Sequence, residues 1–234
     1  MSAQRPYEGF ENWGELLGAV DANRDYFADP LFAEQYLRSE ARADEIRSVN
    51  DSLFPGLLQT EAFAAAILHH YEMIKTDPRP DKEHLALQVR MGRRALTAAN
   101  RIPMRFLVSQ EALDHSEGIV PDSVRAENLR DVVRRVRDSG GRLRVGIIAA
   151  GQSRGLPVGA RGLALTYHRN EGTPPDDPEE FVSVEGRKGQ IAVGQDEALR
   201  LFTEAEEAAR RLAHGKDESL DLMWEMAADL SRRR

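Results

Sequence analysis

Residues 54–60, FPGLLQT, decide how the first half of the chain folds. A proline followed by a glycine favours a turn, and the two leucines after it are typical of side chains that enter a core. Thr60 ends the segment and can cap the helix that follows. In this interpretation the structural residues of the motif are Pro55, Gly56, Leu57 and Leu58. The segment therefore predicts a turn that holds two helices against each other.

Gln59 is the one residue of the motif that this structural interpretation leaves without a task. A functional interpretation gives it one, because the same loop can line a ligand pocket together with arginines from a later helix. The candidate ligand- or partner-binding residues are then Gln59, Thr60, Arg90 and Arg93. Both interpretations stay open at this point.

Helical patterns surround the motif on both sides. Asp29 and Pro30 provide an N-cap and a proline at the first helical position, which predicts a helix over residues 31–49. A short helix over residues 13–20 precedes it. Two further helices follow Thr60 and the linker 76–80, the second capped by Asp81. Their apolar positions are Phe63, Ile67, Tyr71, Ile74, Leu85, Val89 and Leu96. The N-terminal half is therefore expected to be helical.

The pattern changes after Pro103. Met104, Phe106 and Val108 alternate with Arg105 and Ser109, which is the period of a half-buried strand. A helix over 122–138 comes next, and Gly140-Gly141 ends it. Further strands are expected at 142–149, 162–168, 181–185 and 190–193, and further helices at 196–213 and 217–231.

This order of elements predicts the fold class. Helices, then strands, then helices are typical of an α+β protein with a helical N-terminal half, a small antiparallel sheet in the second half and C-terminal helices. Residues 1–30 are expected to form an arm with a short helix, and residues 31–234 a single domain of this class.

Composition excludes several classes of protein. The 234 residues contain no cysteine, so disulfides and thiolate metal sites are ruled out. The net charge of −7, from 39 acidic and 32 basic side chains, works against an unspecific grip on nucleic acid. The first twenty residues mix charges into every apolar stretch, so no export signal is expected, and no window is apolar enough to span a membrane. We expect a soluble, cytoplasmic protein.

The region around the motif resembles a known domain. Glu40, residues 43–47 (ADEIR), FPGLLQT and residues 61–64 (EAFA) are similar to a domain of unknown function that follows the helix-turn-helix in actinobacterial XRE-type transcriptional regulators. That family carries a Glu-bearing helix, then Val-Pro-Gly-Leu-Leu-Gln-Thr and a Tyr-Ala pair. Residues 90–93 (RMGR) are similar to a later run of the family. The resemblance covers residues 31–230 and implies the second half of such a regulator.

Departures from the family pattern concern both the pocket and the N-terminus. Arg94 stands where the family usually has Gln, and Ser109-Gln110 stand where it often has an Asp-Glu pair. Gln110 therefore joins the candidate binding residues, as a position where a contact of the family's pocket is altered. Fewer residues precede the resemblance than a helix-turn-helix domain needs. We expect a free-standing version of the regulator's second half, or one half of a split regulator.

Other patterns that could carry chemistry have plainer interpretations. Residues 151–155 (GQSRG) match the G-x-S-x-G of a nucleophile elbow, but the LPVG that follows cannot easily start the required helix, which favours an ordinary loop. The histidines at 69, 70 and 84 do not share a helix face at metal-ligand spacing. No catalytic residue, metal site or cofactor is predicted.

Arginines are dense between Pro121 and Arg144, where seven of them accompany four acidic residues. Such a face can contact phosphate or an acidic partner. Pairs at helical spacing, such as Asp131 with Arg135, favour instead a solvated face with internal ion pairs.

The leading functional hypothesis is a regulatory module that acts without its own DNA-binding domain. The resemblance implies a small companion protein or a full-length helix-turn-helix regulator as partner, and a small molecule is a further candidate. Direct specific DNA binding and membrane binding are not expected, and a homodimer is left open. One alternative is an enzyme that reuses the fold, for example in a biosynthetic cluster, although we favour a protein without catalytic activity. Another is a decoy fragment that heterodimerises with full-length regulators.

Overall fold

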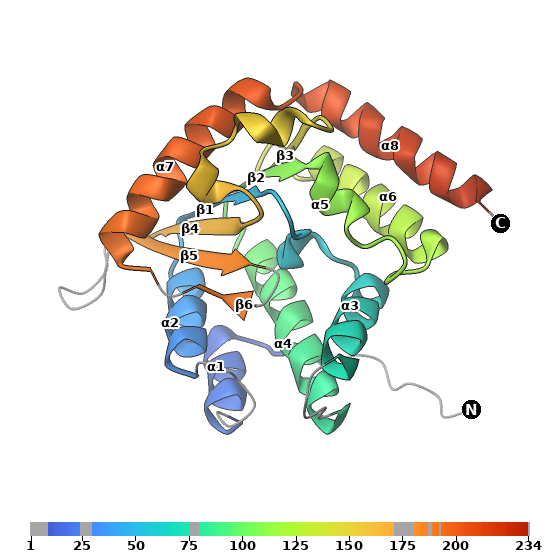
Figure 1. Cartoon of the computed structure of the whole chain (residues 1–234). Coiled ribbons are helices and arrows are strands. Elements are labelled where there is room, and N and C mark those ends of the chain that lie inside the picture. The colour runs from blue at the N-terminus through green and yellow to red at the C-terminus, as the bar shows by residue number, and fades with distance from the viewer. Residues whose placement is uncertain are drawn as a thin grey trace, which may run out of the picture.

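A mixed β-sheet occupies the centre of the molecule (Figure 1). The computed structural model describes residues 9–23, 30–74, 80–170, 180–186, 189–191 and 193–233. In these residues the strands run in the order β3-β2-β1-β4-β5-β6. Their bounds are β1 Glu45–Asn50, β2 Met104–Ser109, β3 Leu143–Ile148, β4 Ala164–Arg169, β5 Glu180–Gly186 and β6 Gly189–Gln190. The strands β1, β2 and β3 are parallel to one another, whereas β4 pairs antiparallel with both β1 and β5.

Helices precede, connect and follow the strands. The α-helices are α1 Trp13–Asp21, α2 Pro30–Ala41, α3 Glu61–Met73, α4 Pro80–Ala99, α5 Gln110–Asp114, α6 Asp122–Asp138, α7 Gln195–Leu212 and α8 Lys216–Arg232. Two crossovers build the parallel half, because α3 and α4 connect β1 to β2, and α5 and α6 connect β2 to β3. The antiparallel half needs only the turn-rich segment after β3, which includes short 3₁₀ turns at Gln152–Gly155 and Val158–Ala160.

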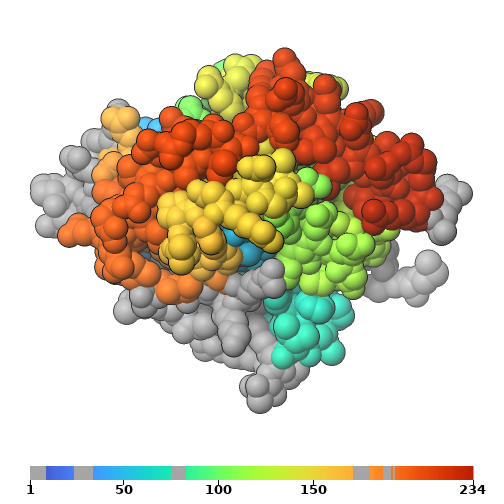
Figure 2. Space-filling view, turned by 45° about the horizontal axis from the view of Figure 1, so that its top comes forward, coloured from blue at the N-terminus to red at the C-terminus, as the bar shows by residue number. Residues whose placement is uncertain are grey.

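Each face of the sheet is covered by its own set of helices. On one face, Ile46, Phe106 and Val145 belong to a core cluster shared with α3, α6 and α8. On the other, alternate residues such as Val49 and Leu165 pack against α7. Figure 2 shows α7 and α8 as adjoining ridges across the surface, with the segment after β3 beside α7. We call the face towards α3 and α6 the helical face of the sheet.

The α+β class, the helical N-terminal half and the C-terminal helices are confirmed. Helix α6 and strand β2 lie where periodicity predicted them, and α1, α7 and α8 begin and end within about two residues of their expected bounds. Gly140 and Gly141, after α6, have φ of 62° and 88°, a conformation that glycine adopts without strain. None of the described helices is long and apolar enough to cross a membrane.

The predicted helix over residues 31–49 is wrong in its second part. Helix α2 ends at Ala41, and residues 45–50 form β1, which lies between β2 and β4. Glu45 and Arg47 hide this strand from sequence patterns, yet Arg47 is held by an ion pair to Glu206 of α7, with Nη1 and Oε2 2.7 Å apart. The prediction of an antiparallel sheet is therefore wrong for β1, β2 and β3, because a strand that precedes two helices can pair in parallel with the next one.

Candidate functional site

The FPGLLQT motif forms a compact turn between β1 and α3. Gly56–Leu58 make a single 3₁₀ turn, in which the amide of Leu58 donates to the carbonyl of Pro55 at 3.0 Å. Leu57 and Leu58 are both buried in the core beside the helical face. Thr60 then caps α3, because its Oγ1 accepts from the amide of Phe63 at 3.4 Å. The structural tasks assigned to these residues from sequence match this geometry.

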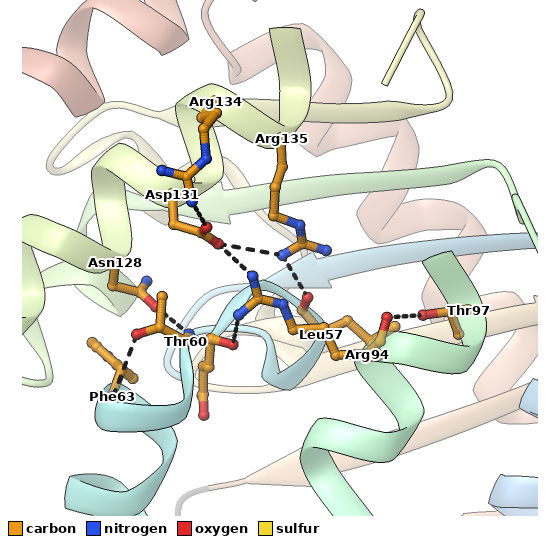
Figure 3. A network of polar contacts seen from close by, with 10 residues as sticks. Leu57, Thr60, Phe63, Arg94, Thr97, Asn128, Asp131, Arg134 and Arg135 are labelled. Atoms are coloured by element: carbon orange, nitrogen blue, oxygen red, sulfur yellow. Dashed lines mark hydrogen bonds and ion pairs between the residues drawn. The ribbon is translucent and has the colours of Figure 1, made fainter. Parts of the chain in front are cut away.

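Two arginines from different helices fix the outward-facing carbonyls of the motif (Figure 3). Arg94 of α4 donates from Nη1 to the carbonyl of Gln59 at 2.6 Å, and Arg135 of α6 donates from Nη1 to the carbonyl of Leu57 at 3.0 Å. Asn128 of α6 accepts the amide of Thr60 at 2.6 Å. Charge-assisted hydrogen bonds of this kind are among the stronger ones in proteins, so the turn is held firmly against α4 and α6.

Asp131 provides the negative charge that holds these arginines together. Its Oδ2 accepts from Nη2 of Arg94 at 2.6 Å and lies 4.0 Å from Nη1 of Arg135, while its Oδ1 contacts Arg134 (Figure 3). Burial, with the charge of Arg94 nearby, lowers the pKa of Arg135 to about 10, against the opposing pull of Asp131. Two of the seven arginines between Pro121 and Arg144, Arg134 and Arg135, thus lie against an acid of their own helix, which agrees with the ion-paired interpretation of this face.

Gln59 has a structural task that sequence reasoning missed. Its Nε2 donates to the carbonyl of Phe54 at 2.8 Å, which closes the turn, and its Oε1 accepts from Nη1 of Arg90 at 2.9 Å. The side chain is buried. Gln59 therefore connects the backbone of the turn to a cation on α4.

A cavity of about 160 Å³ lies between the motif, the helices α2, α3 and α4, and the helical face of the sheet. Its floor consists of alternate residues of four adjacent strands, namely Phe106, Ser48, Asn50, Thr166, Ala164 and Glu185. The rest of its wall includes Tyr36, Phe54, Gly56, Gln59, Phe63, Ile67, Tyr71, Arg90, Arg93 and His115. Asn50 ends β1, so the cavity reaches the carboxyl end of a parallel strand, where α/β sheets commonly bind ligands.

Charged groups line one side of this cavity. Arg93 donates to both carboxylate oxygens of the fully buried Glu40, at 2.6 and 2.9 Å, and to the hydroxyl of Tyr36 at 2.7 Å. Burial alone would lower the pKa of Arg93, but the Glu40 carboxylate raises it above its usual range. Burial raises the pKa of Tyr36 as well.

Glu185 is the acid of the cavity wall itself, whereas Glu40, the partner of Arg93, does not line the cavity. Among the described residues the carboxylate of Glu185 forms no hydrogen bond or ion pair. Burial raises the pKa of Glu185, while the charges of Arg93 and Arg90 oppose that rise and Glu40 adds to it. An acid of this kind, beside a cavity, is a candidate for ligand contact.

The structure brings three of the five sequence-derived candidates together. Gln59, Arg90 and Arg93 all line the cavity. Thr60 lies outside the cavity wall, as a helix cap. Gln110 also lies apart from the wall, where its Oε1 accepts from the amide of Ala150 at 3.2 Å.

Sequence reasoning missed the residues that the sheet contributes. Ser48, Asn50, Thr166 and Glu185 come from strands that are distant in sequence, and only the strand register places them side by side. Ser48 and Asn50 carry no alternating signal in the sequence, because the apolar residues of this stretch, Ile46 and Val49, are three apart and Arg47 is polar. Such polarity is unusual for a central strand.

The other chemical patterns have structural explanations. The G-x-S-x-G segment forms a 3₁₀ turn with no α-helix after the serine, and Ser153 donates from Oγ to Glu111 at 3.3 Å. Within the described residues, no group of three or more His, Asp or Glu side chains is placed to hold a metal ion.

Comparison with known proteins gives a family assignment without an activity. Neither the curated proteins nor the solved structures include a match to the chain. The model of the family described as a domain of unknown function, DUF5753, matches residues 33–225, which contain the motif, the sheet and the whole wall of the cavity. The chain therefore belongs to the DUF5753 family.

Proposed function

We propose that this protein is a regulatory module that binds a small molecule in the cavity beneath the FPGLLQT turn. The observation that carries the proposal is the chemistry of the cavity wall. Buried polar groups in a protein core are normally few and are paired. Here four such side chains, Ser48, Asn50, Gln59 and Glu185, line one cavity, and of these four Glu185 alone has no hydrogen bond or ion pair among the described residues.

The size of the cavity supports a small ligand. An apolar cavity of about 150 Å³ admits benzene, and one water molecule has a share of about 30 Å³ in the liquid. The volume of about 160 Å³ therefore suits one ring or a short branched chain with a polar group. Aromatic and aliphatic side chains, including Phe63, Ile67 and Phe106, provide the apolar contacts that such a ligand needs.

The regulatory role rests on the resemblance to the effector half of XRE-type transcriptional regulators. We propose that ligand occupancy is transmitted to a partner, either a small companion protein or a full-length helix-turn-helix regulator. The motif is suited to this task because it both lines the cavity and contacts α6, which lies near the surface beside α8. A ligand that shifts the turn would also shift α6.

Thermal-shift screening against a library of small metabolites tests the proposal, with a variant that fills the cavity. Ala164 is buried on the floor, so Ala164→Leu places three additional carbon atoms in the space. Ala95→Leu is the matched control, because Ala95 is exposed on α4. We expect at least one metabolite to stabilise the wild type and Ala95→Leu, and to have a much smaller effect on Ala164→Leu.

Two results would contradict the proposal. One is a screen in which no compound stabilises the wild type. The other is a compound that stabilises Ala164→Leu as strongly as the wild type, since its site must then lie elsewhere on the protein.

A further inference from the structure

Polarity changes from one side of the cavity to the other. Across the floor, Phe106 of β2 lies beside Ser48 of β1, and Ser48 lies beside Thr166 of β4. One step further along the strands, Asn50 pairs with Ala164, and Ala164 pairs with Glu185 of β5. The floor therefore changes from an aromatic ring to a carboxylate over three strand spacings of about 4.8 Å each.

The helices that cover the cavity opposite its floor change in polarity in the same direction. Helix α3 packs beside α6, which covers β3, so Phe63, Ile67 and Tyr71 lie towards the β2 side. Helix α2 packs over β4 and β5 and brings Tyr36 and Glu40 to the opposite side, where Arg93 of α4 donates to both. The cavity thus has an apolar end and a charged end, which together fit an amphipathic molecule.

The charged end favours a cation in the ligand. Arg93 already donates to Glu40, and Arg90 donates to Gln59. Among the described residues of the wall, Glu185 is the one charged side chain that forms no hydrogen bond or ion pair, and only the charges of Arg93 and Arg90 act on it from a distance. A partly buried carboxylate without a partner is costly, and a ligand cation removes that cost. A ligand anion beside Glu185 would instead be repelled, so an anionic group of a ligand has to lie beside Arg90 or Arg93 of the wall.

We infer that the ligand carries an ammonium group that pairs with Glu185 and a small apolar body that lies against Phe63 and Phe106; this inference rests on the proposed function. Both simple amines and amino acids have this chemistry. They differ in a carboxylate, to which Arg90 can donate hydrogen bonds because a guanidinium has five N–H donors.

Four probes that share one ring test the inference by calorimetric titration at neutral pH: benzylamine, benzyl alcohol, benzoate and phenylglycine. The first three are nearly equal in size and differ in charge. We expect benzylamine to bind about tenfold or more tightly than benzyl alcohol, the equivalent of one hydrogen bond to a charged group. Benzoate is expected to bind most weakly.

Two substitutions connect the ranking to named residues. Glu185→Gln should lower the affinity for benzylamine by about tenfold and leave benzyl alcohol within about threefold. Its fold should keep nearly the stability of the wild type, because Glu185→Gln relieves the burial of a carboxylate and gives up only the attraction of Arg93 and Arg90, with no hydrogen bond or ion pair among the described residues to lose. Arg90→Met distinguishes an amino acid from a simple amine as the ligand. If the ligand is an amino acid, this variant should lose affinity for phenylglycine and keep its affinity for benzylamine. If the ligand is a simple amine, the wild type should bind benzylamine at least as tightly as phenylglycine.

The inference is overturned if benzyl alcohol or benzoate binds as tightly as benzylamine, or if Glu185→Gln retains full affinity for benzylamine. It is also overturned if neither ammonium compound binds at millimolar concentration. Those results leave the proposed function in place, provided that a metabolite stabilises the wild type and not Ala164→Leu. Failure of that screen removes the proposed function itself.

Discussion

Asp131→Asn is the substitution that best tests how the FPGLLQT turn is held. The variant keeps the shape of the side chain and removes its charge. It also replaces one accepting oxygen with an amide that can only donate hydrogen bonds. The carboxylate now accepts from Arg94 at 2.6 Å and lies 4.0 Å from Arg135, and these two arginines hold the carbonyls of the turn.

The exposure of each partner of Asp131 decides how much its contact contributes to the free energy of unfolding. The side chains of Asp131 and Arg94 are 9% and 21% exposed, so their contact should be worth the upper part of the roughly 1.5–3 kcal/mol of a charged hydrogen bond. Arg134 is 67% exposed, and its contact with the same carboxylate is worth about 0.2–1 kcal/mol. Loss of Asp131 also leaves Arg94 and Arg135 facing each other. We expect Asp131→Asn to lower the free energy of unfolding by about 3 kcal/mol.

Urea unfolding followed by circular dichroism measures this loss. With a denaturant slope of about 3 kcal/mol/M, the midpoint should fall by about 1 M at unchanged slope. Arg134→Gln is the matched control, since it removes a partner of the same carboxylate at the surface, and its midpoint should hardly move. Arg94→Gln, which installs the residue usual in the resembling family, completes a double-mutant cycle with an expected coupling of about 2–3 kcal/mol, the value of the contact between the two side chains. Equal losses for Asp131→Asn and Arg134→Gln, or a coupling near zero, would refute this account of the turn.

Further predictions concern the motif and a buried histidine. Leu57→Asp should lower the free energy of unfolding by about 4 kcal/mol or prevent folding, because it puts a charge at a buried site, and a thermal melt checks this. Gly56→Ala should stay within about 0.5 kcal/mol in urea unfolding, since Gly56 has no positive φ and an added Cβ meets Arg90 Nε at an ordinary 3.8 Å. Burial and Arg93 lower the pKa of His168 to about 4, with Glu40 opposing. As pH falls, the imidazole of His168 therefore takes up a proton in the unfolded chain before it does so in the folded one. The free energy of unfolding should fall by up to about 3 kcal/mol as pH drops from about 6.5 to 4. His168→Phe should remove this part of the acid sensitivity, and an unchanged pH dependence in urea unfolding would count against it.

The prediction for Gly56→Ala differs from what a Pro-Gly pair in a sequence suggests. A Pro-Gly pair is often a turn with glycine at positive φ, which would make any larger residue destabilising. Here Gly56 begins a 3₁₀ turn, and its absent side chain instead faces the Arg90 side chain at the cavity wall. Residues larger than alanine at this position should therefore alter the shape of the cavity more than they alter the free energy of unfolding.

Periodicity predicted those elements whose two faces differ clearly. Helix α6 has Leu129, Val132 and Val136 on its buried side, and β2 has Met104, Phe106 and Val108 on one face, so both were found. Strand β1 was missed because neither of its faces is simply apolar. Ser48 and Asn50 face the cavity, and Arg47 faces an ion pair on α7. Local rules commonly fail where a segment serves a site instead of a core.

The same reason limits what could be predicted of the site. Gln59, Arg90 and Arg93 were accessible from sequence, because the motif and the next helix are neighbours along the chain. Glu185 was not, because its place beside the cavity depends on the pairing of β5 with β4 and of β4 with β1. The register of an antiparallel pair is fixed by packing on both faces, which no short pattern encodes.

The structural and functional interpretations of FPGLLQT apply to opposite sides of one turn. Arg94 and Arg135 hold its carbonyls from the side of α4 and α6, while the Gln59 side chain turns inward to Arg90 and the cavity. A loop that is fixed from outside loses little conformational entropy when a ligand binds inside, so the clamp should raise affinity as well as stability. Asp131 does not line the cavity. If the two sides are coupled in this way, Asp131→Asn should weaken a ligand that it never contacts, whereas Arg134→Gln should leave that affinity unchanged.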